Sequence, residues 1–273
     1  MSETKIDISR ASKAIRDSRF VEALSMLESN LAKDPDHLES LYFAAVCSRY
    51  LKNYIDSQKY LENLLTKAPD MGRAYQELGH LSKAIGNDEN AASHYRQACE
   101  LNPALISSWK SLFNYFTKMK NKPAAEHAYD QIKKLESIPS VLLYINQILN
   151  EGRLGIAEKQ CREYLKKNPT DVYAMSLLAE IANRLGYFDD AEILLENAVK
   201  FSPNDGELRM KYAMILRKKQ KFAKTMEQVN ILCEQFPENL SYQAQKASEV
   251  MQNGDHGLAI ELFESIIEKN KFN

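Results

Sequence analysis

The sequence has little glycine, proline or tryptophan, and its apolar residues never form a long run. Nine Gly and eight Pro stand among 273 residues, while Leu, Ala, Lys, Glu and Ser recur throughout, which favours a predominantly helical protein. The longest unbroken apolar run extends only from Leu41 to Cys47, whereas a membrane-spanning helix needs about 20 apolar residues. The sequence therefore predicts an all-α protein with no segment that crosses a membrane.

Neither sign of charge dominates the chain. Lys and Arg together number 36 and Asp and Glu number 37, which gives a formal net charge of -1. Broad electrostatic binding to nucleic acid or to anionic lipid needs an excess of positive charge. We therefore expect no nucleic-acid partner and no membrane partner.

Cysteine and histidine do not form a recognisable metal or redox motif. The four cysteines are Cys47, Cys99, Cys161 and Cys233, with no CxxC pair and no His at metal-ligand spacing. Buried free thiols are the expected state, and we predict neither a metal nor a cofactor. The N-terminal stretch is rich in charge, with Lys5, Arg10 and Arg16 among its residues, so it lacks the apolar core of a secretory signal. A cytoplasmic location is the default expectation.

The prolines are regularly spaced. Pro35, Pro69 and Pro103 stand at equal intervals, and Pro169, Pro203 and Pro237 repeat the same interval. The gap between the two runs is two positions short of two such intervals, so one junction near Ser137 and Pro139 carries a small deletion. Internal repetition at this period is typical of stacked helical hairpins.

Further positions share the period of the prolines. The position twelve before each marker is small: Ala23, Ser57, Ala91, Ala125, Ala157, Ala191, Thr225 and Ala259. The position twice as far before the marker is small in six of eight units, with Phe113 and Ile145 as the exceptions. Small side chains let two helices cross closely, so we expect the hairpins of units four and five to be opened or rotated.

Larger apolar side chains and turns complete the repeat. Eight positions before the markers stand Leu27, Leu61, Tyr95, Tyr129, Cys161, Leu195, Val229 and Phe263. Each unit is interrupted near its middle, at Gly86, Gly152, Gly186 and Gly254 or at polar stretches around Ser18, Asn53, Lys120 and Gln220. These stretches are predicted turns between two helices, and the marker proline follows the second helix.

A repeating unit of this length and pattern resembles the tetratricopeptide repeat. The third unit matches best, with Tyr75, Leu78, Gly79, Gly86, Ala91, Tyr95, Ala98 and Pro103. The resemblance implies a right-handed superhelix of about eight hairpins whose first helices line a concave groove. The expected units of this single array are 4–37, 38–71, 72–105, 106–137, 138–171, 172–205, 206–239 and 240–273.

The resemblance also implies a function, which is binding of a peptide or protein in the groove. The groove residues in matching phases are Tyr42, Arg49, Arg73, Gln76, His80, Lys83, Lys110, Asn114, Asn183, Met210, Met214 and Arg217. Basic residues outnumber acidic ones in units two to four, which would suit an acidic segment. A solvated face with no partner is an equally good interpretation. Replacing Arg73, Lys83 and Lys110 by Glu is expected to weaken an acidic partner without unfolding the array.

A looser resemblance concerns the order of the units. The runs HLESLYFAAVCSRY, GRAYQELGH, NPALISSWKSL and DVYAMSLLAEIANRLG are similar to the N-terminal half of bacterial proteins that fuse these repeats to a sulfotransferase domain. The nine glycines are scattered among helical turns and offer no phosphate-binding loop after a strand. If such a fusion exists, its catalytic half lies beyond Asn273, and this chain by itself is not an enzyme.

The last predicted helix carries a wide apolar face. Within His256 to Lys269, apolar residues include Leu262 and Ile266. One neighbouring helix cannot cover such a face. We expect either a downstream domain or a second copy of the chain to pack on Leu262 and Ile266.

Overall fold

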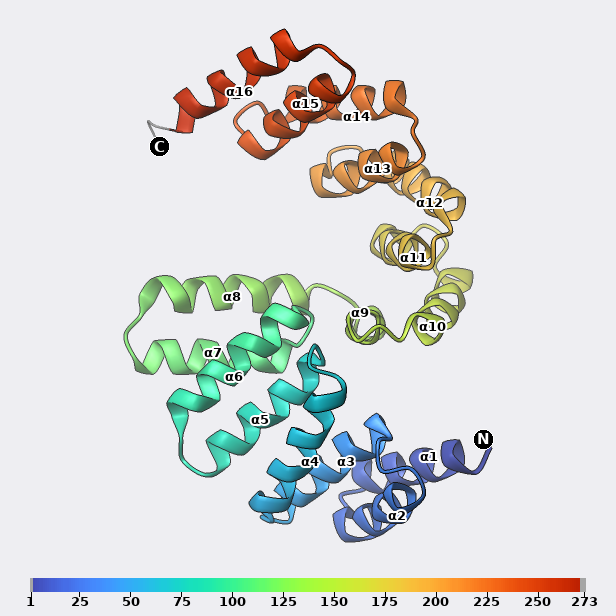
Figure 1. Cartoon of the computed structure of the whole chain (residues 1–273), viewed down its shortest axis with the longest axis vertical. Helices are drawn as coiled ribbons and strands as arrows, with labels where there is room; N and C mark the ends of the chain where they lie inside the picture. Colours follow the sequence, from blue (N-terminus) through green and yellow to red (C-terminus); the bar gives the residue numbers. More distant parts are fainter. Residues whose placement is uncertain (1, 271–273) are drawn as a thin grey trace. The chain divides into compact units, whose positions relative to one another are not determined.

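A computed structural model describes residues 2–270, and the regular elements within this range are sixteen α-helices (Figure 1). This result confirms the all-α prediction. The helices form two compact units, Met1–Gly152 and Arg153–Asn273. In both units, helices that follow one another in the chain pack together as hairpins over most of the length.

The first unit contains nine helices within the described residues. They are α1 (Ser2–Arg16), α2 (Phe20–Lys33), α3 (Leu38–Tyr50), α4 (Tyr54–Lys67), α5 (Gly72–Ala84), α6 (Asp88–Leu101), α7 (Ile106–Lys118), α8 (Lys122–Glu136) and α9 (Ser140–Asn150). The first helices of successive hairpins also contact each other, since α3 touches both α1 and α5. These first helices therefore form one common layer.

The second unit contains seven helices within the described residues. They are α10 (Leu154–Lys167), α11 (Val172–Leu185), α12 (Phe188–Phe201), α13 (Gly206–Lys218), α14 (Phe222–Gln235), α15 (Leu240–Gln252) and α16 (His256–Asn270). Its largest buried cluster joins α11, α12 and α13 through residues such as Ala179, Leu195 and Leu216. Interlocking small and large side chains thus build the core between hairpins.

The turns inside the hairpins are marked by left-handed backbone. Residues with positive φ are Ser18, Lys52, Gly86, Lys120, Gly152, Gly186, Gln220 and Gly254. They recur at the interval of the prolines, which is two positions shorter only between Lys120 and Gly152. At Gly86 the next amide, of Asn87, donates to the carbonyl of Ser82 over 2.9 Å, which is a Schellman closure of the helix. The turn prediction is confirmed.

The small residues lie at the helix crossings, as the repeat predicted. In the second hairpin the Ser57 hydroxyl donates to the carbonyl oxygen of Ala45 over 2.9 Å, so the two small positions touch. In the third hairpin a Cβ added to Gly79 would come within 2.5 Å of the Tyr95 ring. Glycine is needed there because the aromatic ring occupies the space of a side chain.

Helix α9 departs from the repeating arrangement. It does not pack along α8, and an extended connection separates the two helices (Figure 1). Its apolar side chains, including Leu142, Ile145 and Leu149, are nevertheless fully buried. Asn102, at the end of α6, donates from its amide to the carbonyl of Gln147 over 3.1 Å. The outer side of the fourth hairpin is therefore left open by α9. Helices α7 and α8 themselves pack as closely as those of the other hairpins, so the expectation that Phe113 opens this hairpin is wrong.

Candidate functional site

The predicted groove residues lie on first helices of both units. Tyr42 and Arg49 are on α3, Arg73, Gln76, His80 and Lys83 on α5, Lys110 and Asn114 on α7, Asn183 on α11, and Met210, Met214 and Arg217 on α13. In the first unit α3 contacts α5, and in the second unit residues of α11 and α13 line one hollow, so the structure brings part of the predicted groove together in each unit. Their environments differ greatly in burial and in ion pairing.

Arg73 is a buried structural residue. Its guanidinium pairs with Glu39, lies 3.2 Å from Glu151 Oε1 and stands 4.3 Å above the ring of Tyr42. The Arg73 side chain is only 13% exposed. These contacts correct the expectation that Arg73→Glu leaves the array folded, since the change would bury a third carboxylate among these groups.

Arg49 is similarly engaged. Its Nε lies 2.5 Å from Oε1 of Glu77, and its guanidinium carbon lies 4.4 Å from the centre of the Tyr50 ring. Glu77 is 4% exposed in its side chain. Burial raises the pKa of the Glu77 carboxyl, while the hydrogen bond and charge of Arg49 lower it. This pair joins α3 to α5. Because the Arg49 guanidinium is engaged with Glu77 and Tyr50, little of it is accessible to a ligand.

His80 and Gln76 fill the space between helices. His80 Nδ1 lies 2.7 Å from the Tyr95 hydroxyl, and Gln76 Oε1 accepts from the Ser108 hydroxyl over 3.0 Å. Burial lowers the pKa of His80 to about 4, and the nearby charges of Arg49 and Lys83 act in the same direction. The imidazole is therefore neutral near pH 7 and accepts or donates as a packed polar side chain.

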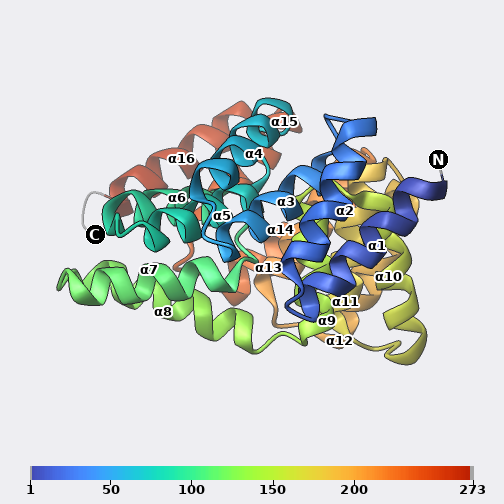
Figure 2. The same ribbon diagram turned by 90° about the horizontal axis from the view of Figure 1, so that it is seen from below.

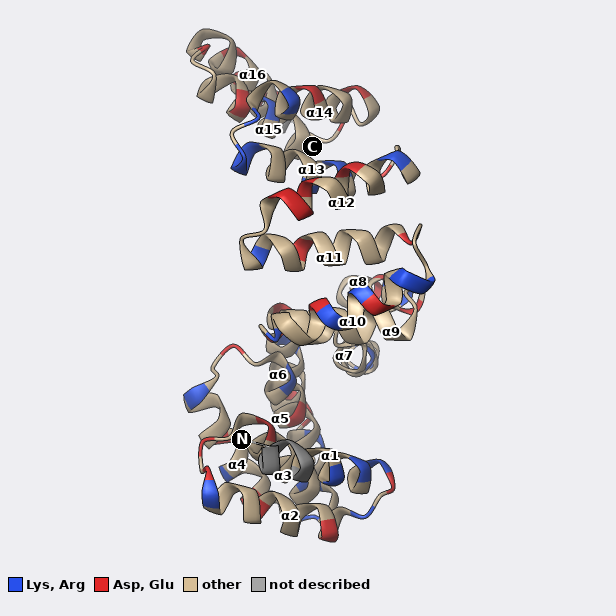
Figure 3. Cartoon of the chain, turned by 90° about the vertical axis from the view of Figure 1, so that its right-hand side faces the viewer, with Lys and Arg blue, Asp and Glu red and all other residues tan. Residues whose placement is uncertain are grey.

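Most basic side chains predicted to line the groove of this unit are paired. Lys110 lies 2.7 Å from Glu136, and Lys118 lies 2.6 Å from Asp88. Lys83 makes no ion pair among the residues that the structure describes, and it lines a hollow of about 240 Å³ with Asn114. Figure 3 shows Lys and Arg interspersed with Asp and Glu along the ribbon. Nearby carboxylates thus neutralise most of the basic residues that the sequence predicted for this part of the groove.

A wider apolar hollow lies in the second unit, between α11 and α13. It has a volume of about 420 Å³, and Asn183, Met210 and Met214 are among its walls, with Ala179, Leu195 and Ile215. Three predicted groove residues therefore meet at one place. Arg217 does not line this hollow; it bonds to Glu249 over 3.1 Å, and Glu249 is 2% exposed.

Two lysines border this hollow that the groove prediction missed. Lys211 Nζ donates to the Ser176 hydroxyl over 3.1 Å, and Lys218 Nζ donates to Asn183 Oδ1 over 2.8 Å. Within the described part of the chain neither lysine has a carboxylate partner. Lys211 stands three positions before Met214 and Lys218 four positions after it, which places all three on one helix face. This stripe of Lys211, Met214 and Lys218 is the sequence pattern that could have predicted the site.

The last helix exposes part of its apolar face. In α16 the side chains of Leu262 and Ile266 are half-buried, while Ile260 and Ile267 are exposed. The structure describes α16 up to Asn270. The predicted contact of Leu262 and Ile266 with another domain or copy stays a prediction.

Among residues 2–270, no group of three or more His, Cys, Asp or Glu side chains is placed to hold a metal ion. Over the same range, every helix is too short or too polar to span a bilayer. The four cysteines are free thiols, and burial raises the pKa of Cys47, Cys99 and Cys161 to about 12.

Comparison with known proteins identifies two stretches of the sequence. Residues 72–105 match one family model described as tetratricopeptide repeat, and residues 149–206 match a second with the same description. The first stretch contains α5 and α6, and the second runs from the end of α9 into the start of α13.

Several solved structures are distantly similar. MamA 41-end from Desulfovibrio magneticus RS-1 is 14% identical, with 75% of this chain and 97% of that chain covered and a TM-score of 0.42. A chain of the APC/C hetero-tetramer Cut9-Hcn1 is 14% identical, with 97% of this chain and 52% of that chain covered and a TM-score of 0.43. A chain of the Naa15/Naa10 structure bound to HypK-THB is 17% identical, with 91% and 39% covered and a TM-score of 0.44. Residues 72–105 and 149–206 are thus tetratricopeptide repeats, within a chain whose described residues form α-helical hairpins.

Proposed function

We propose that this chain is a non-catalytic scaffold that binds a peptide or protein partner in the hollow between α11 and α13. The observation that carries the proposal is the pairing of an apolar hollow with two lysines that have no carboxylate partner among the described residues. Tetratricopeptide hairpins offer such surfaces on their first helices, and this hollow is lined by the first helices α11 and α13 together with Leu195 of α12.

The hollow suits one chemical kind of ligand. Met210 and Met214 form a flexible, polarisable wall that adapts to different apolar side chains. Lys211 and Lys218 at its border can exchange their bonds to neutral groups for bonds to a carboxylate, which are stronger. The partner we propose is therefore an acidic segment that places one apolar side chain in the hollow.

Peptide selection tests this proposal directly. A random peptide library would be selected on the full chain, and the affinity of a selected peptide measured by calorimetry. We expect apolar residues flanked by Asp or Glu, and an affinity loss of about tenfold or more in Lys211→Glu with Lys218→Glu. Lys224→Glu, on the exposed side of α14, is the matched control. Selected peptides that bind the double variant as tightly as the wild type would refute the site.

The first unit provides a smaller surface for the same partner. Lys83 and Asn114 border its hollow of about 240 Å³, whereas Arg49, Arg73 and Lys110 are paired with Glu77, Glu39 and Glu136. We therefore propose that an acidic partner binds at Lys211 and Lys218 of α13 and not at Arg73 and Lys110. Lys83→Glu should reduce binding less than the double variant of the second unit.

The order of the units supports an alternative function, the recruitment or dimerisation half of a bacterial, cytoplasmic sulfotransferase. In this alternative, Leu262 and Ile266 of α16 contact the downstream domain or a second copy. Reading the coding region past Asn273 tests it. A strand followed by a Gly-Thr phosphate loop would support the fusion, and a stop codon would refute it.

A further inference from the structure

The surface formed by α7 and α8 has a covered counterpart in the preceding hairpin. Tyr129 of α8 is 54% exposed, whereas Tyr95, the equivalent residue of α6, is 2% exposed. Helix α7 packs along α6 and covers Tyr95. Within the described part of the first unit, α8 packs along α7 alone, so no helix of this unit takes the corresponding place on α8.

Helix α9, which follows α8 in the chain, is held elsewhere by hydrogen bonds. The side-chain amide of Gln147 donates to the carbonyl of Ala104 over 2.9 Å, and that of Asn150 donates to Asn102 Oδ1 over 3.1 Å. Asn102 is fully buried. These bonds fix α9 at the junction of α6 and α7, and it does not cover Tyr129.

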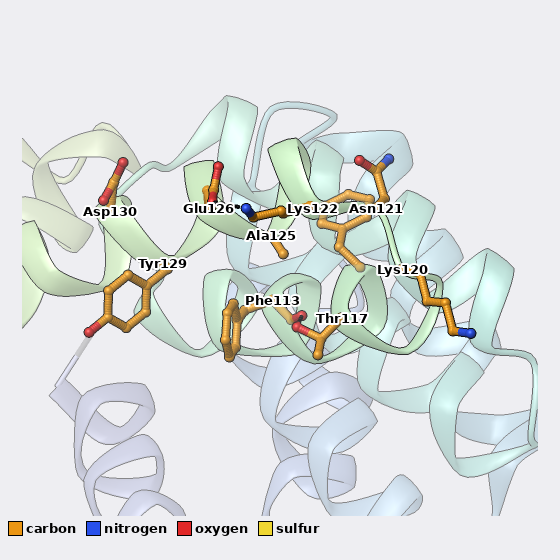
Figure 4. Close-up of a pocket in the computed structure, with 10 residues that line it drawn as sticks. Phe113, Thr117, Lys120, Asn121, Lys122, Ala125, Glu126, Tyr129 and Asp130 are labelled. Carbon is orange, nitrogen blue, oxygen red and sulfur yellow. Dashed lines mark hydrogen bonds and ion pairs between the residues drawn. The ribbon is translucent and has the colours of Figure 1, made fainter.

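The uncovered surface forms a hollow of about 760 Å³. Phe113 and Phe116 of α7 and Ala125 and Tyr129 of α8 supply its apolar lining. Figures 1 and 2 show α7 and α8 side by side, and Figure 4 shows Tyr129 and Phe113 along the hollow. The centres of these two rings are 5.9 Å apart. An apolar recess of this size on a surface helix pair is typical of an interaction site.

This hollow corresponds, position by position, to the smaller hollow of the third hairpin. The residues that the third hairpin contributes to the smaller hollow are Lys83, Asp88, Ala91, Ala92 and Tyr95. The residues one repeat later all line the larger hollow, and they are Thr117, Lys122, Ala125, Glu126 and Tyr129.

The chain itself therefore shows what covers such a surface. The remaining walls of the smaller hollow belong to one helix, α7, through Ser111, Asn114, Tyr115 and Lys118. With α7 in place about 240 Å³ stays open, against about 760 Å³ on the uncovered hairpin. The end of α7 lies at the start of α6, where Lys118 contacts Asp88, so the covering helix runs antiparallel to the helix that it covers.

The charges of the two hairpins differ where the covering helix ends. In the third hairpin, Lys118 in the last turn of α7 lies 2.6 Å from Asp88 in the first turn of α6. The equivalent of Asp88 in α8 is Lys122, whose side chain is 85% exposed and lies 3.7 Å from Glu126. Lys120 lines the same hollow and has no ion-pair partner among residues 2–270. A helix that covers α8 as α7 covers α6 therefore needs Asp or Glu in place of Lys118.

We propose that the α7–α8 hollow binds an amphipathic helix of a partner protein, antiparallel to α8 and with an acidic residue in its last turn. Its apolar residues take the place that Leu112 and Tyr115 of α7 have on α6, at the spacing of one helix face. Its acidic residue pairs with Lys122 and Lys120. Asp130 lies at the opposite end of the hollow from Lys120 (Figure 4) and repels an acidic residue there, which fixes the direction of the bound helix. This site is separate from the hollow between α11 and α13.

A library of helical peptides tests the proposal. The peptides have a background of Ala and Gln, which favours the helix, and they are randomised at the positions that correspond to Ser111, Leu112, Tyr115 and Lys118. After selection on the full chain, we expect apolar residues at the positions of Leu112 and Tyr115 and Asp or Glu at that of Lys118. Fluorescence anisotropy then measures the dissociation constant of a selected peptide.

A charge exchange tests the predicted ion pair. Lys122→Glu in the protein should raise the dissociation constant of the acidic peptide about tenfold or more. A peptide with Lys in place of its acidic residue should bind this variant within about threefold of the original pair. Lys200→Glu is the matched control, because Lys200 is also an exposed lysine that pairs with a glutamate one turn away.

Two further comparisons locate the bound helix. Tyr129→Ser should weaken binding, whereas Tyr187→Ser, at an equally exposed tyrosine of the second unit, should not. The double variant Lys211→Glu with Lys218→Glu should bind the helix as the wild type does, which separates this site from the proposed peptide site. Circular dichroism verifies that each variant is folded. Selection that enriches no helical peptide, Lys enriched as often as Asp or Glu at the last position, or a dissociation constant that Lys122→Glu leaves unchanged would overturn the proposal.

Discussion

Arg73 Nε lies 3.2 Å from Oε1 of Glu151, an ion pair that ties the start of α5 to the residue after α9. The two residues are far apart in the sequence, yet both side chains are almost buried. Arg73 also pairs with Glu39 of α3. One guanidinium thus joins three helices, and it holds α9 on the first-helix side of the unit.

Arg73→Ala should destabilise the chain strongly. It removes the cation that two carboxylates share, and loss of one partner from a buried ion pair costs about 3–5 kcal/mol. Urea unfolding followed by circular dichroism measures the change. Lys110→Ala is the comparison, because the pair of Lys110 with Glu136 is about half exposed and exposed pairs contribute about 0–1 kcal/mol. Equal losses in the two variants would contradict the buried role of Arg73.

Gly79→Ala should cost about 1–3 kcal/mol, because the new methyl group overpacks against the ring of Tyr95. Gly155 of α10 is the control, since a Cβ there meets no atom within 4 Å. Gly155→Ala should stabilise its helix by about 0.5–1 kcal/mol. Thermal unfolding of both variants distinguishes the two effects, and a stabilised Gly79→Ala would show that Tyr95 can move away.

His80 should make the folded state sensitive to acid. Burial lowers its pKa from 6.5 to about 4, so between these pH values the unfolded chain binds more protons at this residue. The stability from this group is constant above pH 6.5 and falls as the pH decreases towards 4, by about 3 kcal/mol in total.

Comparison with His80→Gln isolates this contribution, because the glutamine can still accept from Tyr95 but does not titrate. The free energy of unfolding would be measured in urea between pH 7 and pH 4, at steps of about 0.5 unit. The difference between wild type and variant should change only within that window. A difference that is independent of pH would show that His80 is protonated equally in both states.

Gln220→Gly should stabilise the second unit by about 0.5–1 kcal/mol, because the left-handed conformation costs a side chain about 1–2 kcal/mol, part of which the flexibility of glycine offsets. Gln220 has a φ of 57° in the turn between α13 and α14. The reverse change, Gly186→Ala at a φ of 82°, should destabilise by a similar amount. Melting temperatures measure both changes. Gln220→Gly should raise the melting temperature and Gly186→Ala should lower it, and changes of the same sign would contradict this explanation.

The third hairpin shows how far local sequence determines the structure. Gly79, Ala91 and Tyr95 are in phase with their counterparts in other units. In the structure the ring of Tyr95 lies against Gly79, and Ala91 is buried. The turns at Gly86 and Gln220 could also be predicted from the sequence, because helix periodicity and turn chemistry depend on residues a few positions apart.

The candidate sites depended on contacts that sequence cannot supply. Arg73 has the phase of a groove residue, but its pairing with Glu151 arises from a segment that is remote in the chain. Lys218 has the same charge as Lys110, yet only Lys110 meets a carboxylate among the residues that the structure describes.

The sequence by itself determined the repeating hairpins, since the size of each side chain at a fixed phase decides which neighbour it can pack against. Only the tertiary structure decided which cations are neutralised, which hollow stays open and that α9 leaves α8 uncovered. The physical reason is that ion pairs and helix docking depend on distances between segments remote in the chain, and a change of a few ångströms makes or removes them.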